Sequence, residues 1–155
     1  MQQSSLDKEI LQREVYGPES ERLMMGWAFP GKKDKENDYL DIIEELLYNG
    51  KAVLFDIDLN QAQKVLSAGA GAYALTDHSM FITIGMPKEG QSLDEVRELM
   101  LAEITKLKNG EFDASLLEAI INNMKRLGKM RDDMYIVKTI VTSELSRKIA
   151  DAQGV

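Results

Sequence analysis

Apolar residues along the chain recur at two spacings, which predicts a mixture of strands and helices. A two-residue alternation predicts strands over residues 21–29, 65–75 and 79–86. The turn at Thr76-Asp77 joins the last two, so we expect them to pair as an antiparallel hairpin. The residues that share one face of the first strand are Leu23, Met25, Trp27 and Phe29.

Apolar residues three and four apart predict helices over residues 38–48, 51–59, 92–109, 113–127 and from 132 onward. Asn37 or Asp38 is the expected cap of the first helix. Ser92 and Glu95 form a capping-box pattern, and Asp113 is the expected cap of the next helix. The inward residues of the second helix should be Ala52, Val53, Phe55 and Leu59. Those of the last should be Met134, Val137, Ile140, Val141, Leu145 and Ile149.

This order of elements indicates an α+β fold, an antiparallel-rich mixed sheet with helices packed on one face. Residues 1–13 are polar and lack a clear period, so we expect a flexible lead-in. Residues 14–155 are then a single module, which we expect to be a fragment of a longer, multi-module chain. Gly69 and Gly71 fall on one face of the second strand, which predicts that something packs very close to the backbone there.

Composition excludes several chemistries. The chain has 155 residues, a formal net charge of −7, no cysteine and one histidine, His78. Without cysteine there is no disulfide framework, thiolate zinc site, iron–sulfur cluster or cysteine nucleophile. A single histidine cannot supply the two imidazoles of an H-x-x-E-H zinc site. The acidic balance argues against nucleic acid as a partner, because binding phosphates requires clustered cations.

The side chains that could carry chemistry each have a simpler interpretation. Asp77, His78 and Ser79 would suit a catalytic cluster, but neighbours on a turn rarely face one another, so a solvated histidine is the stronger interpretation. The carboxylate pairs Glu44-Glu45 and Asp132-Asp133 fit solvated helix faces better than acid–base catalysis. The nine methionines fit core filling first and an adaptable peptide-binding face second.

No segment of the sequence is apolar enough to span a membrane, and residues 1–10 lack the basic and apolar regions of a signal peptide. We therefore expect no membrane partner for this chain. Its compartment stays open, and the bacterial periplasm or cell envelope is one setting for a parent protein.

Taken together, several segments resemble the insulinase-like (pitrilysin) zinc metallopeptidase family, in particular the non-catalytic C-terminal module that lacks the H-x-x-E-H motif. The resemblance spans roughly residues 16–133. The segments that carry it are Gly17-Pro18-Glu19, residues 23–30, 38–49 and 61–65, residues 87–94, the run AEITKLKNGEFD at 102–113, and residues 119–123.

The resemblance implies that two halves, each of two such modules, close around an unfolded peptide. Residues 38–48 would be the counterpart of the zinc-binding helix, yet they contain Glu44 and Glu45 and no histidine. We therefore expect no catalytic or metal-binding residue and no cofactor in this chain, with zinc held only by a partner module. The family's substrate-holding Arg and Tyr would fall near Asp58 and Val65, and neither is retained.

The leading hypothesis is a catalytically inactive accessory module of a zinc metallopeptidase, forming part of the substrate chamber or packing against the zinc-bearing half. The chain alone would not be an enzyme, whereas the parent protein or complex would be a zinc metalloendopeptidase. Its partners would be the catalytic module and an unfolded peptide. The alternative is a structural or assembly subunit, or a peptide-binding module, with the same fold and no proteolytic role. A lone module should also form a homodimer or expose a large apolar patch.

Overall fold

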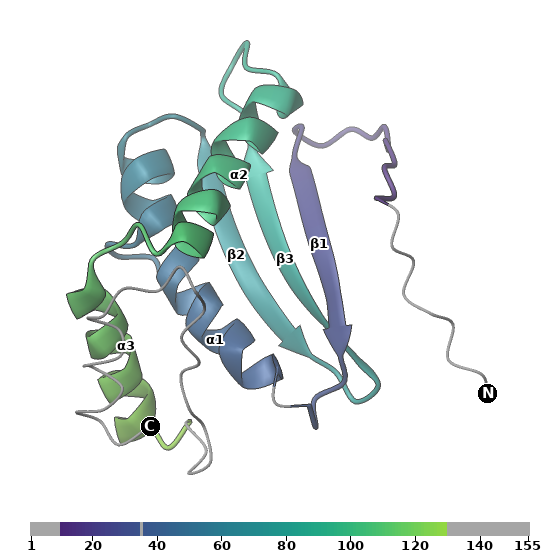
Figure 1. The fold of residues 1–155 in the computed structure, drawn as a ribbon. Coiled ribbons are helices and arrows are strands. Elements are labelled where there is room, and N and C mark those ends of the chain that lie inside the picture. The colour runs from purple at the N-terminus through teal and green to yellow at the C-terminus, as the bar shows by residue number, and fades with distance from the viewer. Residues whose placement is uncertain (1–9, 35, 130–155) are drawn as a thin grey trace.

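A computed structural model describes residues 10–34 and 36–129 (Figure 1). In chain order the elements are β1 (Leu23–Pro30), α1 (Glu36–Leu47), η1 (Asp56–Gln61), β2 (Ser67–Ala74), β3 (His78–Met86), α2 (Leu93–Asn109) and α3 (Ala114–Arg126). The expected α+β fold, with helices against an antiparallel sheet, is confirmed. The helix predicted from residue 132 onward lies outside the described residues.

The sheet has the strand order β1-β3-β2, so β3 is central and pairs antiparallel with both neighbours. The described sheet is thus wholly antiparallel rather than mixed. Trp27 on β1 lies opposite Phe81 on β3, and their ring centroids are 6.3 Å apart. The alternation predicted for β1 and β2 is confirmed, because the register places Leu23, Met25 and Trp27 on the same face of the sheet as Ala68, Ala70 and Ala72.

Helices α1 and α2 cover one face of this sheet, and Figure 1 shows α3 beyond α1. The main core lies between the sheet and the helices, and it consists of Leu40, Leu47, Phe55, Leu59, Val65, Ala68, Phe81, Val96 and Met100. A second cluster joins α1 to α3 and consists of Ile42, Leu46, Leu117, Ile120, Ile121 and Met124. Helix α1 therefore has apolar residues on two sides, one for the sheet and one for α3.

The opposite face of the sheet is apolar and open in the described part of the chain. Its most exposed large side chains are Met24, Tyr73, Met80 and Ile84. Buried methionines fill the core at Met100 and Met124, as expected, whereas Met24 and Met80 do not. A sheet with one uncovered apolar face is unusual for a monomer, and such faces commonly bind another protein surface.

Two of the three predicted helix caps are confirmed. The Ser92 side chain accepts from the Glu95 amide while Glu95 accepts from the Ser92 amide, and Asp113 accepts from the amide of Ser115. The cap predicted at Asn37 or Asp38 is wrong, because α1 begins earlier, at Glu36. The side-chain amide of Asn37 instead donates to three carbonyls between the end of β1 and α1, those of Pro30, Gly31 and Asp34.

The helix predicted over residues 51–59 is displaced toward the C-terminus. Helical structure begins at Leu54 and continues as η1, with Val53, Phe55 and Leu59 buried as expected and Ala52 exposed, against expectation. The cause is Asp56, whose buried carboxylate accepts from the amides of Lys51 and Asn49. These bonds hold residues 49–51 in a loop, so the helix cannot start there.

Among the glycines of the described strands, the close packing predicted over Gly69 and Gly71 occurs at Gly85 instead. The atoms nearest to a Cβ on Gly69 or Gly71 would belong to tyrosine side chains, at 3.6 Å and 3.4 Å, which is ordinary van der Waals contact. A Cβ on Gly85 would stand 2.5 Å from the Sδ of Met100 and 2.6 Å from the Cγ1 of Val96. Helix α2 therefore rests almost directly on the backbone of the central strand.

We expect Gly85→Ala to destabilise the protein by about 1 to 3 kcal/mol, because the added methyl overlaps two buried side chains of α2. Gly26→Ala is the matched control, since its Cβ would find only the Phe81 carbonyl at 3.9 Å. The control should leave the free energy of unfolding unchanged or raise it by up to about 1 kcal/mol. Urea unfolding measures both. Equal effects of the two substitutions would contradict the close contact.

Candidate functional site

The free edge of β2 is the part of the described sheet where backbone groups meet side chains from other elements. The amide and carbonyl of Ala68 both bond to the Asn60 side chain, at 2.7 Å and 2.9 Å. The amide of Ala72 donates to the Oε2 of Glu44 at 2.8 Å. Backbone groups of every second residue point to the same side of a strand, so those of Ala70 face this edge as well.

Ala70 differs from its two neighbours along this edge. Asn60 bonds to Ala68 on one side and Glu44 to Ala72 on the other. For the edge-facing amide and carbonyl of Ala70, the described residues supply no hydrogen-bond partner. Within the described residues, the edge thus offers an open donor and an open acceptor at Ala70, between Ala68, bonded at both groups, and Ala72, bonded at its amide.

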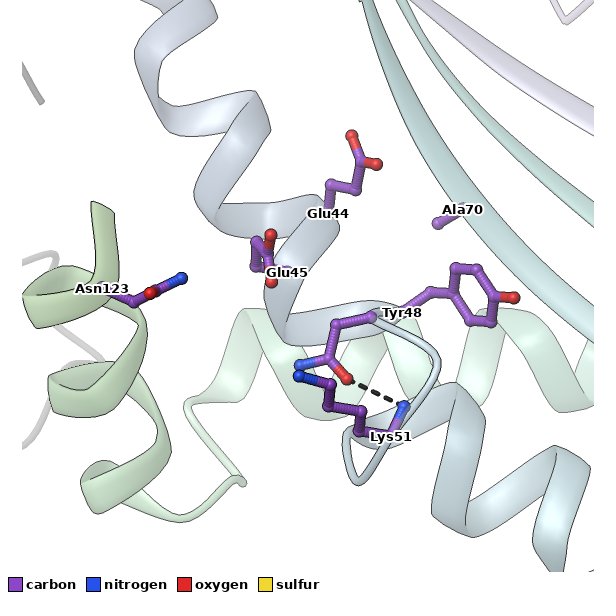
Figure 2. A pocket seen from close by; sticks show the side chains of 7 residues that line it. Glu44, Glu45, Tyr48, Lys51, Ala70 and Asn123 are labelled. Carbon is purple, nitrogen blue, oxygen red and sulfur yellow. Dashed lines mark hydrogen bonds between the residues drawn. The ribbon is translucent and has the colours of Figure 1, made fainter. Parts of the chain in front are cut away.

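Glu44 reaches β2 because α1 lies alongside this edge of the sheet. In Figure 2, Glu44 of α1 and Tyr48, just after its end, project toward β2, whereas Glu45 lies on the side nearer Asn123 of α3. The apolar positions of α1 that meet the sheet and α3 fix this rotation of the helix.

A pocket of about 380 Å³ opens between α1, β2 and α3 (Figure 2). It is lined by Glu44, Glu45, Tyr48, Asn49, Lys51, Ala70 and Asn123. A smaller, adjoining pocket adds Asp41, Met124 and Lys129 to this acidic surface. The open backbone of Ala70 therefore stands at the wall of a space with several carboxylates.

The loop that forms one side of the pocket is held from η1. The carboxylate of Asp56 accepts from the Lys51 amide at 2.9 Å, and Gln61 donates to the Lys51 carbonyl at 2.9 Å. Asn49 accepts from the same Lys51 amide at 3.1 Å, the bond drawn in Figure 2. These bonds hold one wall of the pocket in place.

Burial is the main reason why the pKa of Glu44 is raised above its ordinary value. The hydrogen bond from Ala72 and the charge of Lys129 lower it, whereas the nearby carboxylates Asp41 and Glu45 raise it further. The expectation that Glu44 belongs to a solvated face is therefore wrong, because this side chain is half-buried and bonded to the sheet. Asp132-Asp133, the other carboxylate pair, lies outside the described residues.

The structure does not assemble a catalytic cluster around His78. His78 is the first residue of β3 and lies opposite Pro30 of β1, half-buried rather than in a solvated turn. Asp77 is exposed and Ser79 is completely buried on the helix-facing side. Successive residues of a strand point to opposite faces, so His78 and Ser79 face apart.

The two positions near the family's substrate-holding pair lie at separate places. Asp58 lies on η1 and pairs with Lys106 of α2, with 2.7 Å between Oδ2 and Nζ. Val65 is buried in the main core, with 2% of its surface exposed. Neither residue lines the pocket at the β2 edge.

A buried carboxylate completes the contact between α2 and η1. Lys106 also donates to the Oε1 of Glu103 at 2.9 Å, whereas the buried Oε2 of Glu103 has no hydrogen-bond partner in the described structure. Burial raises the pKa of Glu103, and the hydrogen bond from Lys106 lowers that of Asp58. Of the two carboxylates that contact Lys106, Glu103 therefore favours the neutral form and Asp58 favours the charged form.

We expect Glu103→Gln to remove a pH dependence of stability. Because the pKa of Glu103 is raised in the folded chain, this residue contributes fully to the free energy of unfolding below pH 4.5, the ordinary pKa of a glutamate. That contribution is lost as pH rises from 4.5 through the raised pKa. Stability of the variant relative to the parent chain should thus increase from pH 4.5 toward pH 7, as urea unfolding would show. Glu98→Gln, at an exposed position of the same helix, is the control. If the difference in the free energy of unfolding between Glu103→Gln and the parent chain does not change with pH, the burial of a charge at Glu103 is contradicted.

Sequence reasoning missed the pairing of Glu44 with β2. Glu44 and Ala72 are 28 residues apart, and no local pattern joins them. The one available signal was the run of small residues from Ser67 to Ala72, which keeps that strand accessible to polar side chains.

The described residues contain no group of three or more His, Asp or Glu side chains that could hold a metal ion. Among them there is likewise no helix of the length and apolarity needed to cross a bilayer. The chemistry that the β2 edge offers is hydrogen bonding to an extended backbone, with carboxylates beside it.

Comparisons with known proteins agree with this geometry. The family model described as the peptidase M16 inactive domain matches residues 3–124. A crystal structure of a protease from Helicobacter pylori is similar, with a TM-score of 0.63 and 25% sequence identity. The match covers 69% of this chain and 26% of the Helicobacter chain. The comparison with curated protein sequences finds no match. The earlier resemblance is confirmed, and the chain belongs to the peptidase M16 inactive-domain family.

Proposed function

We propose that this chain is the catalytically inactive accessory module of a zinc metallopeptidase, and that its β2 edge forms part of the chamber wall along which an extended peptide lies. The observation that carries the proposal is the open backbone of Ala70, set beside the pocket within an inactive-domain fold. Binding along a strand edge relies on main-chain hydrogen bonds and needs few special side chains.

The residues of α1 support an inactive role. This helix is the expected counterpart of the zinc-binding helix in the catalytic modules, and it presents Glu44 and Glu45 without any histidine. His78 is the single histidine of the chain and lies on β3, away from the residues that line the pocket. Zinc, a general base and the cleavage step would therefore come from a partner module, in the same parent chain or in a separate subunit.

The size of the match supports a multi-module parent. The match covers 26% of the Helicobacter protease, so most of that protein lies outside the matched part. In such an arrangement the acidic pocket would face the peptide, and the open apolar face of the sheet would be available to a neighbouring module.

The open sheet face also favours a second candidate, a structural or assembly subunit without a proteolytic role. Its four exposed large side chains, Met24, Tyr73, Met80 and Ile84, lie together on a surface with no cover in the described structure. In this case the face would bind a second protein or a second copy, and the β2 edge would have no ligand. The two candidates differ in whether the chain takes part in cleavage of a peptide.

We expect the purified chain to retain no stoichiometric zinc after zinc loading and to cleave no quenched-fluorescent, unstructured peptide. Adding the zinc-bearing module of the same organism should produce cleavage that a chelator abolishes and that exceeds the activity of that module alone. Elemental analysis and fluorescence measure both. Stoichiometric zinc with chelator-sensitive cleavage by the chain alone would contradict the proposal. Self-association in sedimentation velocity, with no effect on the zinc-bearing module, would favour the structural role.

A further inference from the structure

Side chains occupy backbone groups at two of the three successive edge-facing residues of β2, Ala68, Ala70 and Ala72. Asn60 pairs with both backbone groups of Ala68, as a strand residue would, and this contact lies at the start of β2. Glu44 holds the amide of Ala72 with a carboxylate. Natural sheets commonly protect their edges with charged side chains, which prevents unwanted pairing.

The position of Glu44 decides how long an added strand can be. An antiparallel or parallel neighbour bonds to every second residue of an edge, so a peptide seated on Ala70 would next need Ala72. With Glu44 in place the peptide gains the bonds of Ala70 but cannot accept from the Ala72 amide. Without it, the open edge extends from Ala70 past Ala72 toward the end of β2 at Ala74.

We propose that Glu44 is a releasable plug of the β2 edge, whose ionised carboxylate on the Ala72 amide limits peptide binding and whose release admits a longer strand. The proposal rests on the proposed function, since it regulates the same edge. It differs from that function in predicting a specific competition between one side chain of this chain and the backbone of the ligand.

The surroundings of Glu44 make the plug sensitive to acid. The groups that face it are Asp41 and Glu45 of α1, the Ala72 amide of β2, and Lys129 after α3, while Tyr48, Lys51 and Asn123 line the same pocket. Burial raises the pKa of Glu44, so protonation begins above the ordinary range of a glutamate. A neutral acid accepts a weaker hydrogen bond than a carboxylate, so falling pH should loosen the contact.

The probe is an eight-residue, fluorescein-labelled peptide of alternating Thr and Val, whose charge does not change between pH 7 and pH 5 apart from the dye. Binding is measured by fluorescence anisotropy in a separate titration at each pH. The anisotropy is corrected for the effect of pH on the fluorescein dye. The matched control is the same peptide with N-methyl groups on alternate residues, which removes the donors of one edge. Only binding that the methyl groups abolish counts as strand addition.

We expect Glu44→Ala to bind the probe about fivefold more tightly than the parent chain at pH 7, the effect of removing one competing hydrogen bond. The affinity of the parent chain should rise as pH falls, whereas that of Glu44→Ala should stay constant. Glu44→Gln should bind with an affinity between the two and with no pH dependence, because an amide oxygen still accepts from Ala72. Glu45→Ala lines the same pocket and should behave as the parent chain does.

The outcomes separate the plug from the proposed function. Equal affinities of the parent chain, Glu44→Ala and Glu44→Gln, all abolished by N-methylation, would overturn the plug and leave strand addition at β2 intact. Absence of methyl-sensitive binding in every variant would overturn both. If Glu44→Ala fails to fold, by circular dichroism, the pH profiles of the parent chain and Glu44→Gln decide the question, because the proposal requires them to differ.

Discussion

The fold depends on the close approach of α2 to the central strand β3. Gly85 leaves no side chain between them, so Val96 and Met100 rest against the strand backbone. This contact brings the helix layer close enough to enclose Phe81 and its neighbours in one core. A larger residue at Gly85 would lift α2 from the sheet and weaken the packing of the layer as a whole.

The same arrangement assigns α1 to the edge of the sheet. With α2 over the centre, α1 lies beside β2 and packs on the sheet with one side and on α3 with another. Its remaining surface faces the gap beside β2, and this is where Glu44 meets Ala72. The candidate site is therefore a consequence of packing: a helix forced to the edge brings carboxylates to a strand whose backbone is still partly open.

Much of the fold could be predicted from the sequence because it follows from local periodicity. The alternation in β1, β2 and β3, the helical spacing of α1, α2 and α3, and the caps at Ser92 and Asp113 depend on residues close in the chain, and the structure contains these features.

The failures concern contacts that periodicity does not encode, from side-chain bonds across a loop to packing between distant elements. Asn37 bonds to a loop rather than capping α1, Asp56 delays the start of the second helix, and the tight glycine contact lies at Gly85. The site itself depends on one bond across 28 residues. A carboxylate on a helix has the same sequence pattern whether it faces water or a strand edge, so only the packing of α1 distinguishes these cases.

The most direct test of the account is the exchange of backbone amides at the β2 edge, measured by NMR with and without a bound unstructured peptide. If an extended peptide lies along this edge, the Ala70 amide should exchange more slowly in the complex, while the amides of β1 should not change. Protection confined to residues outside β2, or no protection at Ala70 at saturating peptide, would contradict the account.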